Sequence, residues 1–173
     1  MRYFDLGEHV INGPALITLA KIPNLAAQWK VIHEFNPMEY LKGASRTAIW
    51  VKFAEDCYSL AFSPGGVELL FDEKFYDDTL QREISLTLDI AATEPDQLPP
   101  IGELTRIEMT HAVDEETGKY AISVSIAGIE VVKKVRFIDQ EALGMDATIG
   151  IGLADLEMSM PGVVRGLVVL EKS

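Results

Sequence analysis

Two carboxylates, Asp89 and Glu108, are the residues of this sequence best placed for hydrolytic chemistry. Both fall on segments predicted to be strands, with their side chains directed outward. Glycosidases use such a pair, about 5–5.5 Å apart in retaining enzymes and farther apart in inverting ones. No serine triad, phosphate loop or dinucleotide fingerprint accompanies the two residues. The sequence therefore favours a protein that is not an enzyme, with glycoside hydrolysis as the less favoured alternative.

A set of outward-facing residues around one tryptophan predicts binding instead. Trp50 offers a flat apolar face to a sugar ring, and nearby charged groups and hydroxyls can bond to sugar hydroxyls. The predicted ligand-binding residues are Trp50, Lys52, Asp89, Arg106, Glu108, Ser123 and Ser125, with Ser85, Thr87 and Thr110 also facing outward. The same pattern fits a solvated sheet face with one exposed or loop-covered tryptophan.

Acidic side chains gather in the segment "DEKFYDD", which contains Asp72, Glu73, Asp77 and Asp78. Calcium takes six to eight oxygen ligands, so this segment is a candidate calcium site. Its spacing differs from that of an EF-hand loop, and a solvated acidic turn is the alternative interpretation. Apart from calcium, the sequence indicates no cofactor.

Composition excludes several classes of function. The 27 acidic and 15 basic residues give a net charge of −12, which repels nucleic acid and anionic membrane surfaces. The single cysteine, Cys57, can form neither an intramolecular disulfide nor a cysteine-based zinc cluster. No segment approaches the roughly 18 apolar residues of a membrane span. The N-terminal "MRYFDLGEHV" shows no signal-peptide pattern, so the compartment stays open, although an extracellular location is favoured.

Alternation of apolar and polar residues is the dominant pattern, and the 173 residues fit one domain spanning 1–173. Two short segments, 72–83 and 139–146, could hold a helical turn, and the three prolines of 92–103 exclude regular structure there. Strand and turn rules predict about twelve strands. They lie near residues 2–6, 15–20, 29–36, 47–53, 57–63, 67–71, 84–91, 104–113, 119–127, 129–137, 147–153 and 163–171.

The segment "WKVIHEFNPMEY" resembles the "HFNPR" strand with which galectins bind galactose. His33 and Asn36 are three residues apart, however, so a regular strand directs them to opposite faces, and Met38 replaces the galectin arginine. A β-bulge would be needed to bring the two together. We therefore expect His33 to be a buried histidine with its hydrogen bonds satisfied, and Asn36 to lie at a strand end before Pro37.

Trp29 in an early strand and three glycine-spaced segments carry a wider resemblance. The segments are "LTRIEMTHAVDEETGKYAISVSIAG", "ATIGIGL" and "PGVVRGLVVLE". Over residues 15–171 the chain resembles the concanavalin A-like lectin/glucanase superfamily, which includes laminin-G and pentraxin domains. The resemblance implies an all-β, two-sheet antiparallel jelly-roll sandwich that binds glycans on a concave sheet or its edge loops. The glucanase run E-x-D-x-E is absent, since "RIEMT" supplies one carboxylate.

The leading hypothesis is a non-enzymatic, lectin-like domain that recognises a glycan or glycoprotein through the face around Trp50. The first alternative is a structural or assembly module that contacts proteins through a sheet face or an edge strand such as 163–171. Such pairing would make a homo-oligomer possible. The third and least favoured hypothesis is a glycosidase.

Overall fold

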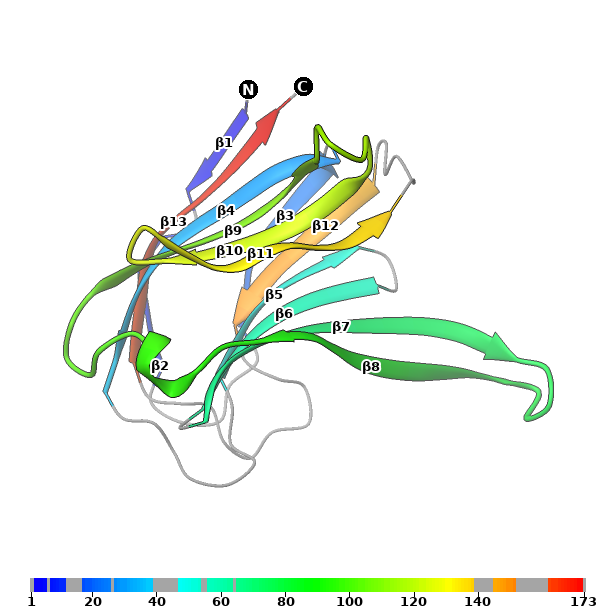
Figure 1. The fold of residues 1–173 in the computed structure, drawn as a ribbon, viewed down its shortest axis with the longest axis horizontal. Coiled ribbons are helices and arrows are strands. Elements are labelled where there is room, and N and C mark those ends of the chain that lie inside the picture. Colours follow the sequence, from blue (N-terminus) through cyan, green and yellow to red (C-terminus); the bar gives the residue numbers. More distant parts are fainter. Residues whose placement is uncertain are drawn as a thin grey trace.

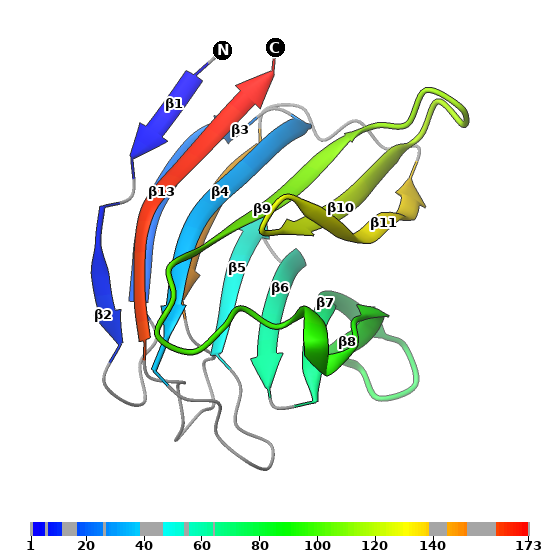
Figure 2. The same ribbon diagram turned by 60° about the vertical axis from the view of Figure 1, so that its left-hand side comes forward.

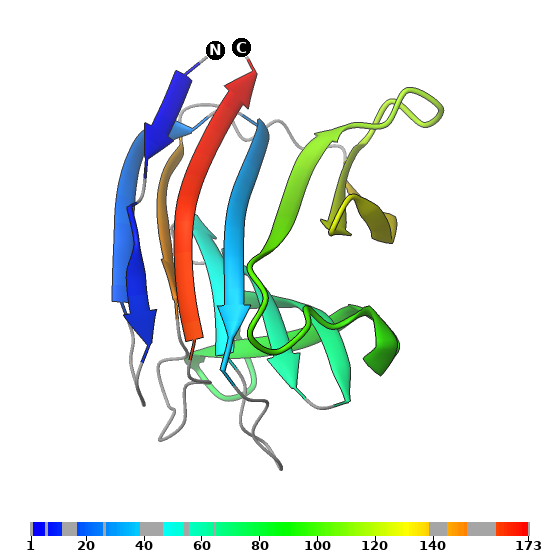
Figure 3. The ribbon, with the colours of Figure 1, turned by 90° about the vertical axis from the view of Figure 1, so that its left-hand side faces the viewer.

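The computed structural model describes residues 2–5, 7–11, 17–25, 27–38, 47–53, 56–63, 65–138, 145–151 and 162–172. For part of these strands, including 72–77 and 83–90, the backbone alone is described. Two antiparallel sheets pack face to face as a β-sandwich (Figures 1 and 3). The two-sheet all-β prediction is therefore confirmed.

The larger sheet, called sheet A, carries both ends of the chain, and Figure 2 looks onto it. Its strand order is β1 (Arg2–Asp5), β13 (Gly162–Lys172), β4 (Gln28–Pro37), β9 (Thr105–Val113), β10 (Tyr120–Ile126) and β11 (Ile129–Ile138), and β2 (His9–Ile11) also pairs with β13. The order of sheet B is β3 (Ile17–Leu25), β12 (Met145–Ile151), β5 (Thr47–Phe53), β6 (Asp56–Ser63), β7 (Gly66–Asp77) and β8 (Arg82–Ala92).

The core lies between the two sheets, where their inward rows of side chains meet. Aromatic pairs join the layers: Phe35 of β4 stacks on Phe62 of β6 with ring centroids 5.1 Å apart. Trp29 of β4 contacts Tyr58 of β6 at 6.3 Å. Each large apolar side chain removed from water contributes about 1.5–3 kcal/mol, so these contacts hold the layers together.

β4 alternates without interruption between buried and half-buried residues. Its pairing with β9 is also continuous, from Trp29 opposite His111 to Phe35 opposite Thr105. Because β4 contains no bulge against β9, His33 faces the core while Asn36 lies in the other row. The predicted separation of these two residues is confirmed.

The expectation that His33 is hydrogen-bonded is wrong. Its side chain is fully buried, and neither ring nitrogen has a hydrogen-bond partner among the described residues. Burial lowers the pKa of His33 from 6.5 to about 3, so the ring stays neutral in the folded protein. His33 thus acts as a core residue at the expense of two unsatisfied polar atoms.

All twelve predicted strands are found, and the described chain contains one more, β2. Segment 72–83, expected to be an acidic loop with helical turns, instead continues β7 and β8 as one hairpin with a turn at 78–81. The physical reason is unbroken antiparallel pairing, which runs from Leu70 opposite Asp89 to Asp77 opposite Arg82. The other helical candidate lies mainly in 139–144, outside the described residues, while 92–103 holds one 3-10 turn, η1 (Pro95–Gln97).

The prediction that 163–171 is an edge strand is also wrong. It corresponds to β13, which pairs with β4 on one side and with β1 and β2 on the other. Its run of valine and leucine suits a strand in the interior of a sheet rather than at an edge.

The turn before β7 depends on Gly66. Its φ is +131°, and a Cβ built there would overlap the carbonyl oxygen of Thr93. Thr93 N–H in turn donates to Val67 O at 2.8 Å, and Val67 N–H donates to Thr93 Oγ1 at 3.2 Å. The chain after β8 is thereby attached to the start of β7.

We expect Gly66→Ala to lower the free energy of unfolding by about 3 kcal/mol or more, because strain at positive φ is added to a steric overlap. Gly118→Ala is the matched control, since Gly118 has φ +71° but open space around it. That change should cost about 1 kcal/mol. Urea denaturation of both variants measures the difference, and equal losses would contradict the role of the Thr93 contact.

We expect the free energy of unfolding to fall as the pH is lowered from 6.5 towards about 3. In this range His33 takes up a proton in the unfolded protein but stays neutral in the folded one. The loss in this window is up to about 1.4 kcal/mol per pH unit. His33→Leu should reduce this pH dependence, because it removes the group whose proton uptake differs between the folded and unfolded states. Urea denaturation at pH 7, 5 and 4 makes the comparison. A His33→Leu profile parallel to that of the wild type would contradict this account.

Candidate functional site

The structure divides the predicted ligand-binding residues between the two sheets. Arg106 and Glu108 lie on β9, and Ser123 and Ser125 lie on β10, all in sheet A. Trp50 and Lys52 lie on β5, and Asp89 lies on β8, all in sheet B. The expectation of one continuous surface is therefore wrong. Each residue lies on the strand predicted for it, but the order of the strands decides which residues share a surface.

Trp50 does not present an open aromatic face. It lies in the row opposite to the core residue Val51, and its side chain is still only 9% exposed. Its register partner Ser59 is buried too, as is Leu70, which lies opposite Ser59 on the next strand. The indole Nε1 has no hydrogen-bond partner among the described residues. The predicted platform for a sugar ring is therefore absent at Trp50 as the structure shows it, whereas Lys52 is exposed.

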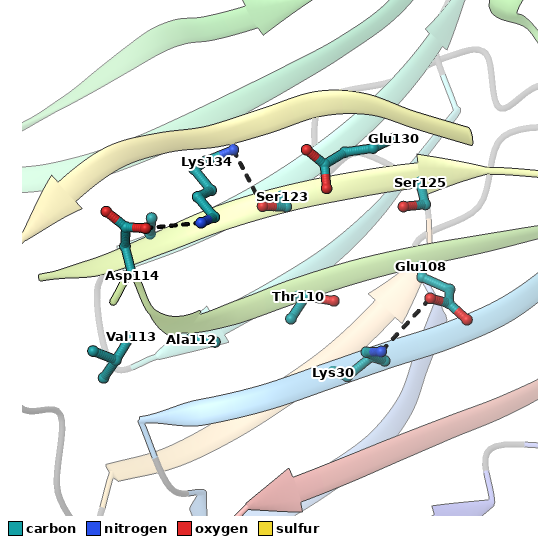
Figure 4. Close-up of a pocket in the computed structure, with 11 residues that line it drawn as sticks. Lys30, Glu108, Thr110, Ala112, Val113, Asp114, Ser123, Ser125, Glu130 and Lys134 are labelled. Atoms are coloured by element: carbon teal, nitrogen blue, oxygen red, sulfur yellow. Dashed lines mark hydrogen bonds and ion pairs between the residues drawn. The ribbon is translucent and has the colours of Figure 1, made fainter. Parts of the chain in front are cut away.

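The four predicted residues of sheet A lie together on its outer face. Opposite positions on β9 and β10 pair Glu108 with Ser125, and Thr110 with Ser123, while Lys30 of β4 lies opposite Thr110. A pocket of about 270 Å³ lies over these strands (Figure 4), and we call it the sheet A groove. It is lined by Lys30, Glu108, Thr110, Ala112, Val113, Asp114, Ala121, Ser123, Ser125, Glu130 and Lys134. Arg106 lies beside it.

Glu108 is held at one end of the groove by two cations. Arg106 Nε and Nη2 lie 2.8 and 2.7 Å from Glu108 Oε1, and Lys30 Nζ lies 3.7 Å from Oε2. Arg106 reaches this carboxylate because residues two apart on a strand share a face. The groups are partly exposed, so their effect on stability is small. The two cations instead fix the orientation of the Glu108 carboxylate, part of which still faces the groove.

Asp114 and Lys134 form the other end of the groove. Lys134 Nζ lies 2.8 Å from Asp114 Oδ1, and the Thr117 hydroxyl donates to Asp114 Oδ2 at 2.9 Å. The side chain of Asp114 is only 2% exposed. The hydrogen bonds from Lys134 and then from Thr117 hold the pKa of Asp114 below its usual value, and the same ion pair raises the pKa of Lys134. Asp114 is therefore a charged acceptor rather than a proton donor.

An irregularity in β11 brings Lys134 to this position. The register with β10 shifts between Ile122 and Val124, and Lys134 takes a φ of +22°. Its backbone N–H then donates to Ser123 Oγ at 3.2 Å while its ammonium group reaches Asp114 (Figure 4). Sequence reasoning missed Lys134 because no glycine marks this bulge. Lys30 could have been found, since the parity of β4 already directed it outward.

The groove combines fixed charges with available hydroxyls. Three carboxylates and two ammonium groups line it, together with Thr110, Ser123 and Ser125. Among the described contacts, Thr110 and Ser125 have no side-chain hydrogen bond, so their hydroxyls can donate to or accept from a ligand. Such a surface can bind a molecule that carries many hydroxyl groups.

The predicted calcium ligands lie on the β7–β8 hairpin. Asp72, Glu73 and Asp77 are strand residues whose side chains are not described, and Asp78 is exposed in the turn. Within the described part of the chain, no three His, Cys, Asp or Glu residues are grouped as metal ligands would be. A helix with the length and hydropathy needed to cross a bilayer is likewise not found there.

No protein-family model matches the sequence, and no curated protein matches it significantly. Similar solved structures exist. Domain 4 of AbnA, a GH43 extracellular arabinanase from Geobacillus stearothermophilus solved with arabinotriose, has a TM-score of 0.59 and 19% identity, covering 94% of this chain and 69% of that one. The receptor binding domain of botulinum neurotoxin D has a TM-score of 0.57 and 13% identity, covering 96% and 41%.

Mouse laminin α1 domains LG4–5 give a TM-score of 0.50 and 15% identity, covering 98% of this chain and 41% of that chain. This chain thus spans less than half of the laminin and neurotoxin chains. Identities this low establish the fold alone. The chain has a jelly-roll β-sandwich of the concanavalin A-like kind, as the sequence resemblance predicted.

We expect Lys134→Met to destabilise the protein at pH 7, because it leaves the buried Asp114 carboxylate without its cation. The pKa of Asp114 is depressed, so this stabilisation is present above the unfolded pKa of about 3.9 and is lost as the pH falls through the folded value. The difference from the wild type should therefore shrink in acid. Lys133→Met, at the exposed neighbouring lysine, is the control, and equal urea midpoints for the two variants at pH 7 would contradict the assignment.

Proposed function

We propose that this chain is a carbohydrate-recognition domain without catalytic activity, and that it binds glycan in the sheet A groove. The observation that carries the proposal is the convergence of polar residues from four neighbouring strands on one outer face. This site differs from the one predicted from sequence. It is centred on the row formed by Lys30, Thr110 and Ser123 rather than on Trp50.

The chemistry of the groove supports this proposal. Each sugar hydroxyl is both a donor and an acceptor, so sugar recognition benefits from fixed partners of both kinds. Glu108 supplies an oriented acceptor, Lys30 and Lys134 supply donors, and the hydroxyls of residues such as Ser125 can serve as either. Because ion pairs already hold the charged groups, less side-chain entropy is lost when a ligand binds.

The arrangement of the carboxylates supports recognition rather than hydrolysis. A glycosidase acid needs a raised pKa so that it keeps a proton to donate. Asp114 has the opposite shift, caused by Lys134. Glu108 is held in ion pairs by Arg106 and Lys30, which fix its carboxylate in place.

The likeness to known folds indicates which ligands to try first. The arabinanase domain was solved with arabinotriose. Arabinose oligosaccharides are therefore reasonable first probes, within a broader panel of neutral and acidic glycans.

An assembly module remains the second candidate function. The observation that favours it is the β7–β8 hairpin, which extends well beyond the body of the sandwich (Figure 1). Such an arm offers its backbone to another protein without involving the groove.

We expect Thr110→Val and Ser125→Ala each to weaken glycan binding about 5- to 13-fold, the effect of losing one hydrogen bond of about 1–1.5 kcal/mol. Neither change disturbs the ion pairs. A glycan array identifies the ligand, and titration calorimetry with that ligand compares the variants.

Lys52→Ala is the matched control, because Lys52 is exposed on sheet B and belongs to the surface suggested by sequence. It should leave binding unchanged. If Lys52→Ala abolishes binding while Ser125→Ala does not, the glycan site lies on sheet B and the groove proposal is wrong. Release of products from the bound glycan would contradict the non-enzymatic part.

A further inference from the structure

Two open sheets present four edges, and unpaired backbone groups at an edge can pair with another chain. Natural proteins protect such edges with short strands, bulges, lysines or prolines. The four edges of the described sandwich are formed by β1 with β2, by β11, by β3 and by β8. They differ in how far each is protected.

Three of the edges carry recognisable protection. β1 and β2 are short strands of four and three residues. β11 carries Lys133, Lys134 and Arg136, takes positive φ at the last two, and pairs irregularly with β10. β3 carries the exposed residues Lys21 and Pro23, and its pairing with β12 is also interrupted.

β8 lacks these devices over most of its length. It has eleven residues, "REISLTLDIAA", with neither lysine nor proline. Its one register shift falls at Ile90 near the C-terminal end, which leaves residues 82–89 in continuous pairing with β7. In the described sheets β7 is its single strand neighbour. The hairpin extends away from the body of the sandwich (Figure 1), and β8 also lies close to β11 for part of its length.

We propose that β8 pairs antiparallel with β8 of a second copy of this chain, about a two-fold axis at Ser85. Two-fold pairing places each residue opposite a defined partner on the same face. An axis at Ser85 uses residues 82–88, all within the regular part of the strand. The two copies then form one continuous sheet through their hairpins.

The sequence of β8 is complementary to itself in this register. Ile84 lies opposite Leu86 of the second copy, which keeps the apolar row on one face, and Glu83 lies opposite Thr87. Moving the axis by one residue, to Leu86, would place Glu83 opposite Asp89, and two like charges would repel each other. The register at Ser85 avoids that contact.

Ser85 lies opposite itself in the proposed dimer, and this gives a direct test by sedimentation velocity at physiological salt. The wild type should approach twice the chain mass of 19.1 kDa as its concentration rises. Ser85→Lys and Ser85→Glu should each be monomeric at the same concentrations, because each places two like charges in contact. An equimolar mixture of the two variants should regain the double mass.

Thr18→Lys, at an exposed position on β3 at the opposite edge of sheet B, is the matched control and should dimerise like the wild type. Circular dichroism and urea midpoints verify that every variant is folded. A wild type that stays monomeric up to millimolar concentration overturns the proposal. A dimer that persists in both Ser85 variants, or a mixture that remains monomeric, overturns it as well.

Discussion

The pleated alternation of β4 and β9, in the middle of sheet A, is the constraint on which both the core and the groove depend. One row of these strands contains Trp29, Phe35 and Met109, which pack against sheet B. The other row contains Lys30 and Glu108, which line the groove. A one-residue slip would exchange the two rows, burying charge and exposing aromatic rings, so the apolar core fixes the register and with it the geometry of the groove.

The same constraint explains how much could be predicted from sequence. Alternation predicted all twelve strands and the correct face for Glu108, Ser123 and Ser125, because strand parity is a local property. The division of the candidate site between two sheets was not predictable, since β5 and β9 are separated by a topology that parity does not encode. The length of hairpin 66–92 was underestimated because its acidic residues are typical of loops. Regular pairing between the two strands outweighs their weak strand preference.

The electrostatics of the groove contrast with those of the whole chain. The net charge of −12 would leave an isolated carboxylate among many others. In the groove, however, Glu108 and Asp114 each contact a cation from another position on the same sheet. These pairs set directions for hydrogen bonding rather than adding much stability. Specificity for a polar ligand depends more on such orientation than on charge alone.

One irregular strand links the groove to the edges of the sandwich. The bulge in β11 makes this edge a poor partner for another chain, and it also gives Lys134 the backbone geometry with which it contacts Ser123 and Asp114. A regular β11 would alternate its lysines between the two faces and leave a flat edge beside the groove. The proposed recognition on the face of sheet A and the proposed association through β8 use different strands, and the bulge in β11 that completes the groove also makes the edge beside it a poor partner for another chain.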